Sequence, residues 1–308
     1  MAGRHVVGLV GCGRWGRNIL RDLVDLGCEV IVVARSEGSR RHAREGRAAA
    51  VCGTLKDMPP VEGIVVATSS PSHAEVVERL LERNVPIFVE KPMTVDAAGA
   101  ARLARQAADR LFVMHKWRYH PGVEMLAEFA RKDYLGPVIG LQTRRTGWSS
   151  IDREEDPVWY LTPHDLSICL EVLGPVPAPR AAAVEFVGDR PVGMRALLGE
   201  APWFAFEVSA RRGEWRRTVR LIGREGTAVL ADPYADHVQL IRGNAWRGPE
   251  APEPEKVPIS TELPLRRELQ AFLGHLDGGP PPRSSAAEGA SEAATIEGLR
   301  RLAGLPSP

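Results

Sequence analysis

The sequence has few cysteines, almost no net charge and no long apolar run. Its four cysteines, at 12, 28, 52 and 169, show neither metal-ligand spacing nor a disulfide framework, which favours reduced thiols and no bound metal. The 40 basic and 39 acidic residues leave a net charge of +1, so nothing predicts binding to nucleic acid or an anionic membrane. No run of about 18 apolar residues and no signal-type N-terminus is present. We therefore expect a soluble, cytoplasmic protein.

The length and composition are those of an ordinary globular protein. With 308 residues, 44% of them apolar and 26% charged, the chain is long enough for two buried cores. We find no internal repeat.

The first glycine-rich turn organises the beginning of the chain. An apolar run, Val6–Val10, leads into Gly11, Gly13 and Gly16, and a helical pattern covers residues 17–26. A strand, a G-x-G-x-x-G turn and a helix start a dinucleotide-binding βαβ unit, although a purely structural glycine turn is the alternative. The helix N-terminus would attract the cofactor's phosphates. The turn residues expected to contact the cofactor are Gly11, Cys12, Gly13, Arg14, Trp15 and Gly16.

The end of the second strand bears on the choice of cofactor. A run of β-branched residues, 28–34, ends in Arg35 and Ser36, where an NAD-binding protein would carry an acidic residue. Arginine and a small hydroxyl suit a 2′-phosphate, so we predict NADP(H) over NAD(H), with Arg35, Ser36 and Arg40 as contacts. The alternative for Arg40 and Arg41 is a solvated helix face, which also fits Arg44.

Two further strand ends carry polar residues. The apolar run 63–67 leads into a loop expected to lie near the cofactor, because ligands bind at the carboxyl ends of parallel strands. Its candidate contacts are Thr68, Ser69, Pro71 and His73. The next strand, 85–89, ends in Glu90-Lys91-Pro92. A lysine there is half-desolvated and can orient a hydroxyl and stabilise a developing oxyanion, with Glu90 keeping it charged. A surface salt bridge at a strand end is the alternative.

The second half of the chain has a different pattern. After a helix at 121–132, short strand-like runs between 138 and 241 are separated by tight turns, which predicts antiparallel pairing. Residues 242–264 suggest extended surface chain, and residues 265–276 and 284–304 suggest helices. We therefore predict an α/β protein. A doubly wound Rossmann domain at 1–118 precedes an α+β domain at 119–308 that has a large, mostly antiparallel sheet.

A histidine in the second half stands in what resembles a helix start. Thr162 would be the N-cap, Pro163 the first helical residue, and Asp165 would complete the cap. His164 would then lie in the first turn, where the helix dipole favours the neutral imidazole that can accept a proton. A capping-turn histidine without chemistry is the alternative.

Taken together, these motifs resemble the glucose–fructose oxidoreductase and inositol dehydrogenase family (Gfo/Idh/MocA). The similarity rests on the glycine turn, the Ala67–His73 stretch and Glu90-Lys91-Pro92, and it runs the length of the chain. Residues 115–121 resemble the family's interdomain segment. Residues 159–168 resemble its second catalytic motif, as found in members that act on nucleotide-linked sugars.

The resemblance implies roles for particular residues. Lys91 would contact nicotinamide and substrate, and His164 would donate or accept the proton. Lys116, Arg118 and Tyr119 are candidate substrate contacts, together with Tyr160 and His164. Tyr160 stands where the subgroup has an aspartate, so it either supplies a hydroxyl acid or closes the pocket. The resemblance also implies a homo-oligomer, a dimer or tetramer, formed through the C-terminal sheet, and a last helix that packs back on the first domain.

The motifs and the resemblance together predict an NADP(H)-dependent oxidoreductase that interconverts a secondary alcohol and a ketone. The expected substrate is a sugar, with nucleotide-linked sugars as the leading class, or a related polyol. Two alternatives stay open. In the first, the same fold reduces an imine or enone, a reaction that depends less on an acid–base pair of the kind used for alcohols. In the second, the protein binds the cofactor in a regulatory role, without turnover.

Overall fold

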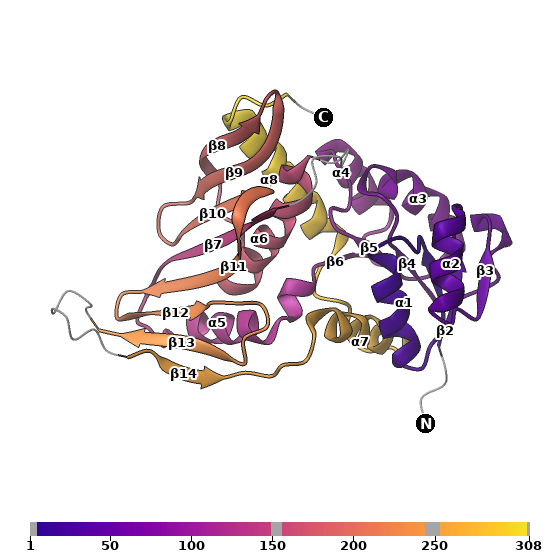
Figure 1. The fold of residues 1–308 in the computed structure, drawn as a ribbon, viewed down its shortest axis with the longest axis horizontal. Coiled ribbons are helices and arrows are strands. Elements are labelled where there is room, and N and C mark those ends of the chain that lie inside the picture. Colours follow the sequence, from indigo (N-terminus) through magenta and orange to yellow (C-terminus); the bar gives the residue numbers. More distant parts are fainter. Residues whose placement is uncertain (1–4, 149–155, 244–252, 307–308) are drawn as a thin grey trace. The chain divides into compact units, whose positions relative to one another are not determined.

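The structure is a computed structural model that describes residues 5–148, 156–243 and 253–306. Its contacts divide the chain into two compact units (Figure 1). The first unit comprises residues 1–116 and 265–294, and the second comprises residues 117–264 and 295–308. Among the described residues, no helix is both long and apolar enough to cross a membrane.

The first unit contains a six-stranded parallel sheet. Its strands are β1 (Val6–Val10), β2 (Glu29–Val33), β3 (Ala50–Cys52), β4 (Gly63–Val66), β5 (Ile87–Glu90) and β6 (Leu111–Met114). Their order, β3-β2-β1-β4-β5-β6, places β1 beside β4 and reverses direction there. This is the doubly wound Rossmann order, whose ligands bind at the carboxyl ends of the strands next to the reversal.

Helices connect the strands of this sheet. They are α1 (Gly16–Asp25), α2 (Glu37–Glu45), α3 (His73–Leu80) and α4 (Ala97–Gln106). Short 3-10 helices lie at Leu55–Asp57, Ser70–Ser72, Leu81–Arg83 and Lys116–Tyr119. Apart from the edge strand β3, the strands are buried over nearly their whole length, which explains their continuous β-branched and apolar sequences.

Late segments of the chain complete the first unit. The helix α7 (Pro264–Leu276) buries Leu269 and Phe272 in the core of the parallel sheet, and the Phe272 ring stacks on Phe88 with centroids 5.0 Å apart. The helix α8 (Ala286–Leu302) begins two residues after Ser284, whose carbonyl accepts a hydrogen bond from the Val113 backbone in β6. The first unit is therefore completed by residues that follow its last strand by more than 140 positions.

The second unit is built on an eight-stranded sheet. Its strands are β7 (Val138–Trp148), β8 (Pro179–Val187), β9 (Arg190–Leu198), β10 (Trp203–Ser209), β11 (Arg211–Gly223), β12 (Gly226–Leu230), β13 (His237–Arg242) and β14 (Glu255–Pro258). The order is β14-β13-β12-β11-β7-β10-β9-β8, and only the β10–β7 pair is parallel. The predicted fold class is therefore confirmed. The edge strand β14 lies in a stretch that its Pro and Glu content had indicated to be irregular.

Two helices pack on this sheet. The helices α5 (Pro121–Arg131) and α6 (Pro157–Leu173) contact each other, and α6 also contacts β7, β9 and β10. Along β7, Leu141, Thr143 and Arg145 are buried, whereas Gln142 is exposed. The sheet thus has a buried face toward the helices and an opposite face that carries charged side chains.

Candidate active site

The glycine turn has the geometry that a dinucleotide requires. Gly11 adopts φ of +95°, and a Cβ there would lie 2.6 Å from the Ala67 carbonyl oxygen. A Cβ on Gly16 would lie 2.3 Å from the carbonyl oxygen of Gly11, so α1 can approach β1 only with glycine at this position. A Cβ on Gly13 would meet no atom of the described chain within 4 Å. The protein itself does not need glycine at 13, which fits a bound group that approaches the backbone there.

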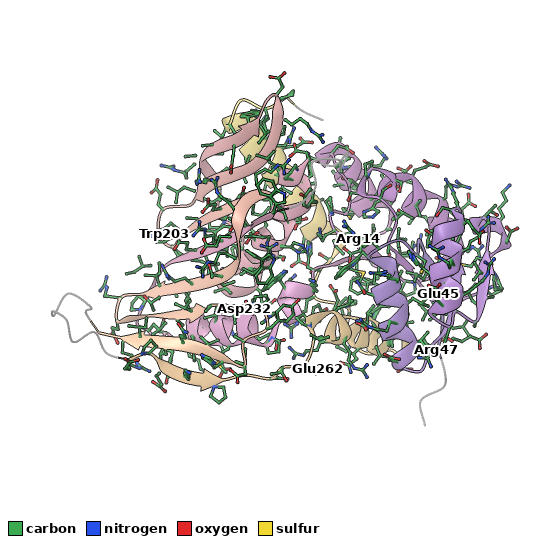
Figure 2. The ribbon with its side chains drawn as sticks, viewed as in Figure 1. Arg14, Glu45, Arg47, Trp203, Asp232 and Glu262 are labelled. Atoms are coloured by element: carbon green, nitrogen blue, oxygen red, sulfur yellow. The ribbon has the colours of Figure 1, made fainter. Side chains whose placement is uncertain are left out.

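The start of α1 leaves positive potential at this turn. Neither an acidic residue in the first turn nor a side-chain hydrogen bond from Trp15 satisfies the helix N-terminus. Arg14 is exposed beside it (Figure 2). The Cys12 side chain, in contrast, is fully buried in the core, so only its backbone faces the turn. The helix dipole and the exposed Arg14 suit a pyrophosphate.

Trp15 connects the turn to two later motifs. Its indole N–H donates to Oε1 of Glu90 at the end of β5, and the Lys116 ammonium lies 4.5 Å from the centre of its ring. Burial raises the pKa of Glu90, while Lys91, the Trp15 hydrogen bond and Lys116 oppose that shift. The structure therefore brings together three of the predicted site residues, Trp15, Glu90 and Lys116.

The loops after β4 and β5 are held to each other by His73. This residue is 1% exposed, and its ring nitrogens lie 2.8 Å from the Pro92 carbonyl oxygen and 3.2 Å from that of Thr68. The Ser72 hydroxyl donates to Thr68 at 2.8 Å. Ser69 and Pro71 are both exposed in the same loop. His73 thus contacts two backbone loops, and its predicted cofactor contact stays a prediction.

Two buried carboxyl groups that were not predicted from the sequence interact electrostatically with Lys91 and Lys116. Glu292 of α8 places Oε2 3.2 Å from Nε2 of His115, with both side chains buried. Burial raises the pKa of Glu292 well above its usual range, and the charge of Lys91 opposes this shift. Glu268 of α7 has its pKa raised first by burial and then by Glu90, against Lys116 and the His115 backbone. Glu292 therefore lies within electrostatic reach of Lys91, and Glu268 within electrostatic reach of Lys116.

The helical periodicity of the sequence contains a signal for both buried acids. Glu268 stands three residues after Leu265 and four before Phe272, on the apolar stripe of its helix, and Glu292 has the same relation to Ile296. A carboxylate on a buried stripe is unusual and indicates a specific environment.

The end of β2 keeps the features that suggested NADP(H). Ser36 is the N-cap of α2 and accepts a hydrogen bond from the Ser39 backbone, while Arg35 is exposed. Arg40 turns back and donates from Nε to the Ala34 carbonyl at 3.1 Å. Arg41 and Arg44 instead pair with acidic residues of their own helix, Glu45 and Glu37, as a solvated face would.

The second motif differs from the predicted helix start. Helix α6 begins at Pro157, with Asp156 as the N-cap that accepts from the Val158 backbone at 2.8 Å. Pro163 therefore lies inside the helix and His164 about two turns from its beginning, so the first-turn dipole argument for a neutral His164 was wrong. The sequence contains two Asx/Thr-Pro pairs at this helix, and the earlier one forms the cap.

Asp165 does not act as a cap. Its Oδ2 accepts from Nε of Arg145 in β7 at 2.8 Å, with side chains 1% and 5% exposed. The same guanidinium lies 4.6 Å from the centre of the Trp117 ring. This buried ion pair fixes α6 on the sheet and so positions its neighbour, the partly exposed His164. Tyr160, one turn before His164, lies on the same face of the helix and is 8% exposed.

Two other predicted substrate contacts are engaged within the second unit. The Arg118 Nε donates to Oε2 of Glu171 in α6 at 2.9 Å, and both side chains are largely buried. Tyr119 is 5% exposed. Their predicted substrate roles stay predictions. Residues 149–155, which precede the second motif, lie outside the described residues. In the part of the chain that the structure describes, no group of three His, Cys, Asp or Glu side chains could hold a metal ion.

Comparison with known proteins agrees with this arrangement. Residues 6–115 match the GFO_IDH_MocA family, described as an oxidoreductase family with an NAD-binding Rossmann fold. The chain is 26% identical to an inositol 2-dehydrogenase of Ralstonia nicotianae, with 96% of this chain and 93% of the relative aligned.

Solved structures share the fold of both units. A UDP-N-acetylglucosamine 3-dehydrogenase from Acidithiobacillus ferrooxidans superimposes with a TM-score of 0.83 at 21% identity, covering 97% of this chain and 98% of the other. A levoglucosan dehydrogenase in complex with NADH and levoglucosan superimposes with a TM-score of 0.85 at 15% identity, covering 98% of each chain.

Proposed function

We propose that this chain is a member of the Gfo/Idh/MocA oxidoreductase family, which its residues 6–115 match, and that it interconverts a secondary alcohol and a ketone on a sugar or related polyol, with NADP(H) as the cofactor. Nucleotide-linked sugars are the substrate class that we favour. In this proposal residues 1–118 hold the cofactor and residues 119–308 supply the substrate site and the contacts between subunits.

The glycine turn is the observation that carries the proposal. Gly13 leaves its backbone open, and the N-terminus of α1 has no acidic side chain in its first turn. Trp15 ties this turn to Glu90, the residue before Lys91. One hydrogen bond thus joins the glycine turn to the residue next to the candidate catalytic lysine, which supports a site that aligns cofactor and substrate.

Lys91 and His164 have complementary tasks in this reaction. When bound, the nicotinamide exchanges a hydride with the substrate carbon. In the oxidative direction, the alcohol loses that hydride from its C–H bond and a proton from its O–H bond, and the His164 imidazole accepts the proton. The Lys91 ammonium stabilises the negative charge that develops on the oxygen. In the reductive direction each transfer runs backward, and protonated His164 supplies the proton.

The preference for NADP(H) is supported by the end of β2. Arg35 is exposed there, Arg40 reaches the Ala34 carbonyl, and no carboxylate precedes α2 to bind a ribose hydroxyl. A guanidinium can bind a 2′-phosphate through two parallel hydrogen bonds.

Substitution of Lys91 by Met tests the proposal. We expect turnover to fall about 10²–10⁴-fold, the usual contribution of a positioned acid–base group, while the Kd for NADPH changes only a few-fold. Binding is measured by Trp fluorescence, to which Trp15 contributes, and turnover is measured on a panel of nucleotide ketosugars, polyols and cyclic imines. Lys132→Met, a change at an exposed lysine paired with Glu128, is the matched control. Normal activity of Lys91→Met would refute the assignment, and cofactor binding without turnover by the unmodified protein would support the regulatory alternative.

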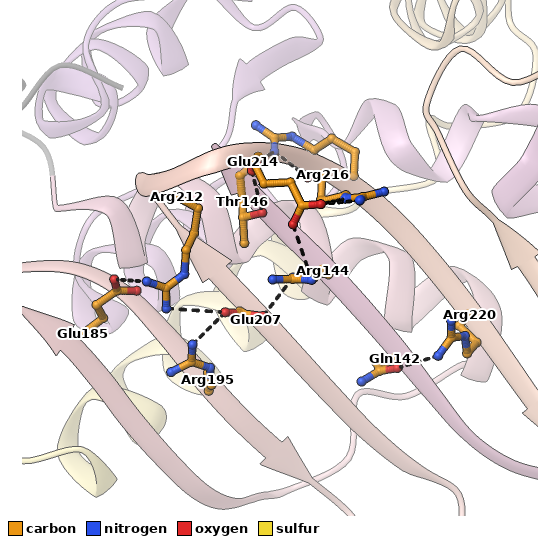
Figure 3. A network of polar contacts seen from close by, with 11 residues as sticks. Gln142, Arg144, Thr146, Glu185, Arg195, Glu207, Arg212, Glu214, Arg216 and Arg220 are labelled. Carbon is orange, nitrogen blue, oxygen red and sulfur yellow. Dashed lines mark hydrogen bonds and ion pairs between the residues drawn. The ribbon is translucent and has the colours of Figure 1, made fainter. Parts of the chain in front are cut away.

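Assembly through the larger sheet is a further part of the proposal. On the face opposite α5 and α6, Glu207 lies 3.0 Å from Arg144 and 2.8 Å from Arg195, and Arg212 lies 2.7 Å from Glu185 (Figure 3). A broad face of alternating charge can pair with a second copy of itself, as closed symmetric dimers require. Light scattering coupled to size exclusion measures the mass. A monomer at micromolar concentration would contradict this part.

A further inference from the structure

The pairing of β11 with β7 places a second arginine beside the one that fixes α6. Arg217 stands directly opposite Arg145 in the antiparallel register, so both side chains lie on the face of the sheet that α6 covers. Arg145 is matched by Asp165 at 2.8 Å. Among the ion pairs of the described residues none includes Arg217, whose Nη1 donates to the backbone carbonyls of Thr146 and Arg216. The pair of arginines therefore carries an excess positive charge.

Burial makes this excess charge energetically costly. It lowers the pKa of Arg217 to about 10, and the charge of Arg145 adds to the effect. Asp165, Tyr234 and Tyr160 act in the opposite direction, so Arg217 lies within electrostatic reach of the residues that flank His164 on α6. An anion beside Arg217 would relieve the cost of a half-buried cation.

Aromatic rings adjoin the same guanidinium. The Arg217 guanidinium carbon lies 5.0 Å from the centre of the Trp215 ring. The Tyr234 ring lies nearly parallel to Trp215, with an interplanar angle of 6° and centroids 6.5 Å apart. Trp215 is 50% exposed and Tyr234 75% exposed. A Cβ on Gly147 would lie 3.2 Å from Trp215, so a glycine at this position gives the indole ring room to pack.

Together these groups offer a cation and flat apolar faces within one unit of the chain. All hydrogen bonds of Arg217 within the described residues come from Nη1, so its Nε and Nη2 can reach an oxyanion. Exposed Trp and Tyr faces stack well on the C–H face of a sugar ring or on a nucleobase. Neither feature suits a neutral, fully hydroxylated polyol alone.

We propose that Arg217, Trp215 and Tyr234 form a subsite for an anionic carbohydrate, in which the guanidinium binds a phosphate or carboxylate group and the aromatic rings receive an adjoining ring. The inference rests on the proposed function, because the subsite would hold the substrate that His164 and Lys91 transform. It distinguishes this chain from enzymes whose substrate is an uncharged inositol.

Steady-state kinetics with three substrates tests the subsite: UDP-N-acetylglucosamine, glucuronate and myo-inositol. Arg217→Gln removes a charge-assisted hydrogen bond to the anionic group. We therefore expect KM for whichever charged substrate the protein turns over to rise about 10–100-fold, while kcat changes much less. The Kd for NADPH and any turnover of myo-inositol should stay within about 2-fold. The matched control is Arg216→Gln on the same strand, whose guanidinium pairs with the exposed Glu214. If Arg217→Gln raises KM for UDP-N-acetylglucosamine, the anion is a phosphate; if it raises KM for glucuronate, the anion is a carboxylate.

A binding measurement that needs no turnover separates this inference from the proposed function. UDP and glucuronate are titrated into the protein while Trp fluorescence is followed, with Trp215→Phe to show which signal comes from the subsite. If either ligand binds and Arg217→Gln weakens it, the subsite stands even when no carbohydrate is turned over. If the protein oxidises myo-inositol but binds neither ligand, the subsite is refuted and the proposed function stands. Equal effects of Arg217→Gln on charged and neutral substrates would also refute it.

Discussion

At the end of β2, a single side chain is expected to set the preference between the two cofactors. Arg35 is exposed and adjoins the capping residue Ser36. Replacing Arg35 by Ala removes the guanidinium that would bind the 2′-phosphate, which costs about 1.5–3 kcal/mol for a hydrogen bond to a charged group. We therefore expect the Kd for NADPH to rise about 10–100-fold and the Kd for NADH to change little.

The helix that follows offers a control for this change. Arg41→Ala removes an arginine that pairs with Glu45 in solvent, so it should affect neither cofactor by more than about 2-fold. Both constants are measured by fluorescence titration at fixed ionic strength. An equal loss of NADPH and NADH affinity in Arg35→Ala would mean that Arg35 contacts the shared pyrophosphate, and an unchanged preference would remove the argument for NADP(H).

Individual elements show where the sequence predicts well and where it does not. Strand ends such as Glu90-Lys91 were predictable because a buried parallel strand is a continuous apolar run that ends abruptly. The start of α6 was not, because Asp156-Pro157 and Thr162-Pro163 carry the same local signal and only packing decides between them. The partner of Asp165, on a strand 20 residues earlier, depends on a tertiary contact that local pattern does not contain.

The ion pair that holds α6 on the sheet gives a prediction for stability. Asp165→Asn leaves Arg145 buried without a countercharge and near a second cation, Arg217, so we expect a loss of about 3–5 kcal/mol. Urea unfolding monitored by circular dichroism measures the change. Glu207→Gln, which weakens a partly exposed network on the opposite face, should cost about 1 kcal/mol or less. The prediction is contradicted if the two variants lose equal stability.

The buried acid of α7 gives a prediction for pH dependence. Burial and Glu90 raise the pKa of Glu268 above its ordinary value of 4.5, with Lys116 and the His115 backbone opposing. The folded protein therefore holds this proton more tightly than the unfolded chain does. The resulting stability is complete below the unfolded pKa and is lost as pH rises toward the folded pKa.

Glu268→Gln removes the ionisation and keeps an acceptor for the His115 backbone. We expect its Tm to exceed that of the unmodified protein by about 2–4 °C at pH 8, the shift from about 1 kcal/mol in a domain of this size. The difference should shrink as pH falls to 5. Glu82→Gln, at an exposed position, should show no such trend. A Tm gain that is independent of pH would mean that folding does not raise the pKa of Glu268, and it would contradict the prediction.

On the scale of the whole molecule, the nucleotide-binding motifs and the nucleotide-binding unit do not cover the same stretch of chain. Every motif of that unit lies before residue 119, so sequence patterns place a domain boundary there. The contacts, however, group residues 265–294 with the first unit. The reason is the apolar stripe of α7, whose Leu265, Leu269, Phe272 and Leu273 belong to the same core as β1 and β5. Helical periodicity reveals such a stripe but not the surface that it covers.

A fragment of residues 1–118 is therefore expected to be unfolded, although it holds the complete glycine turn and Lys91. Burial of each large apolar side chain contributes about 1.5–3 kcal/mol, so the loss of four from α7 approaches the total stability of a typical domain, about 5–15 kcal/mol. Joining residues 1–118 to residues 263–294 by a flexible linker should restore a cooperative thermal transition and NADPH binding. In the joined chain, Phe272→Asp should abolish both, because it places a charge against Phe88, while Gln270→Asp on the exposed side of α7 should not. Cooperative unfolding of the 1–118 fragment alone would show that α7 covers a core that is already sufficient.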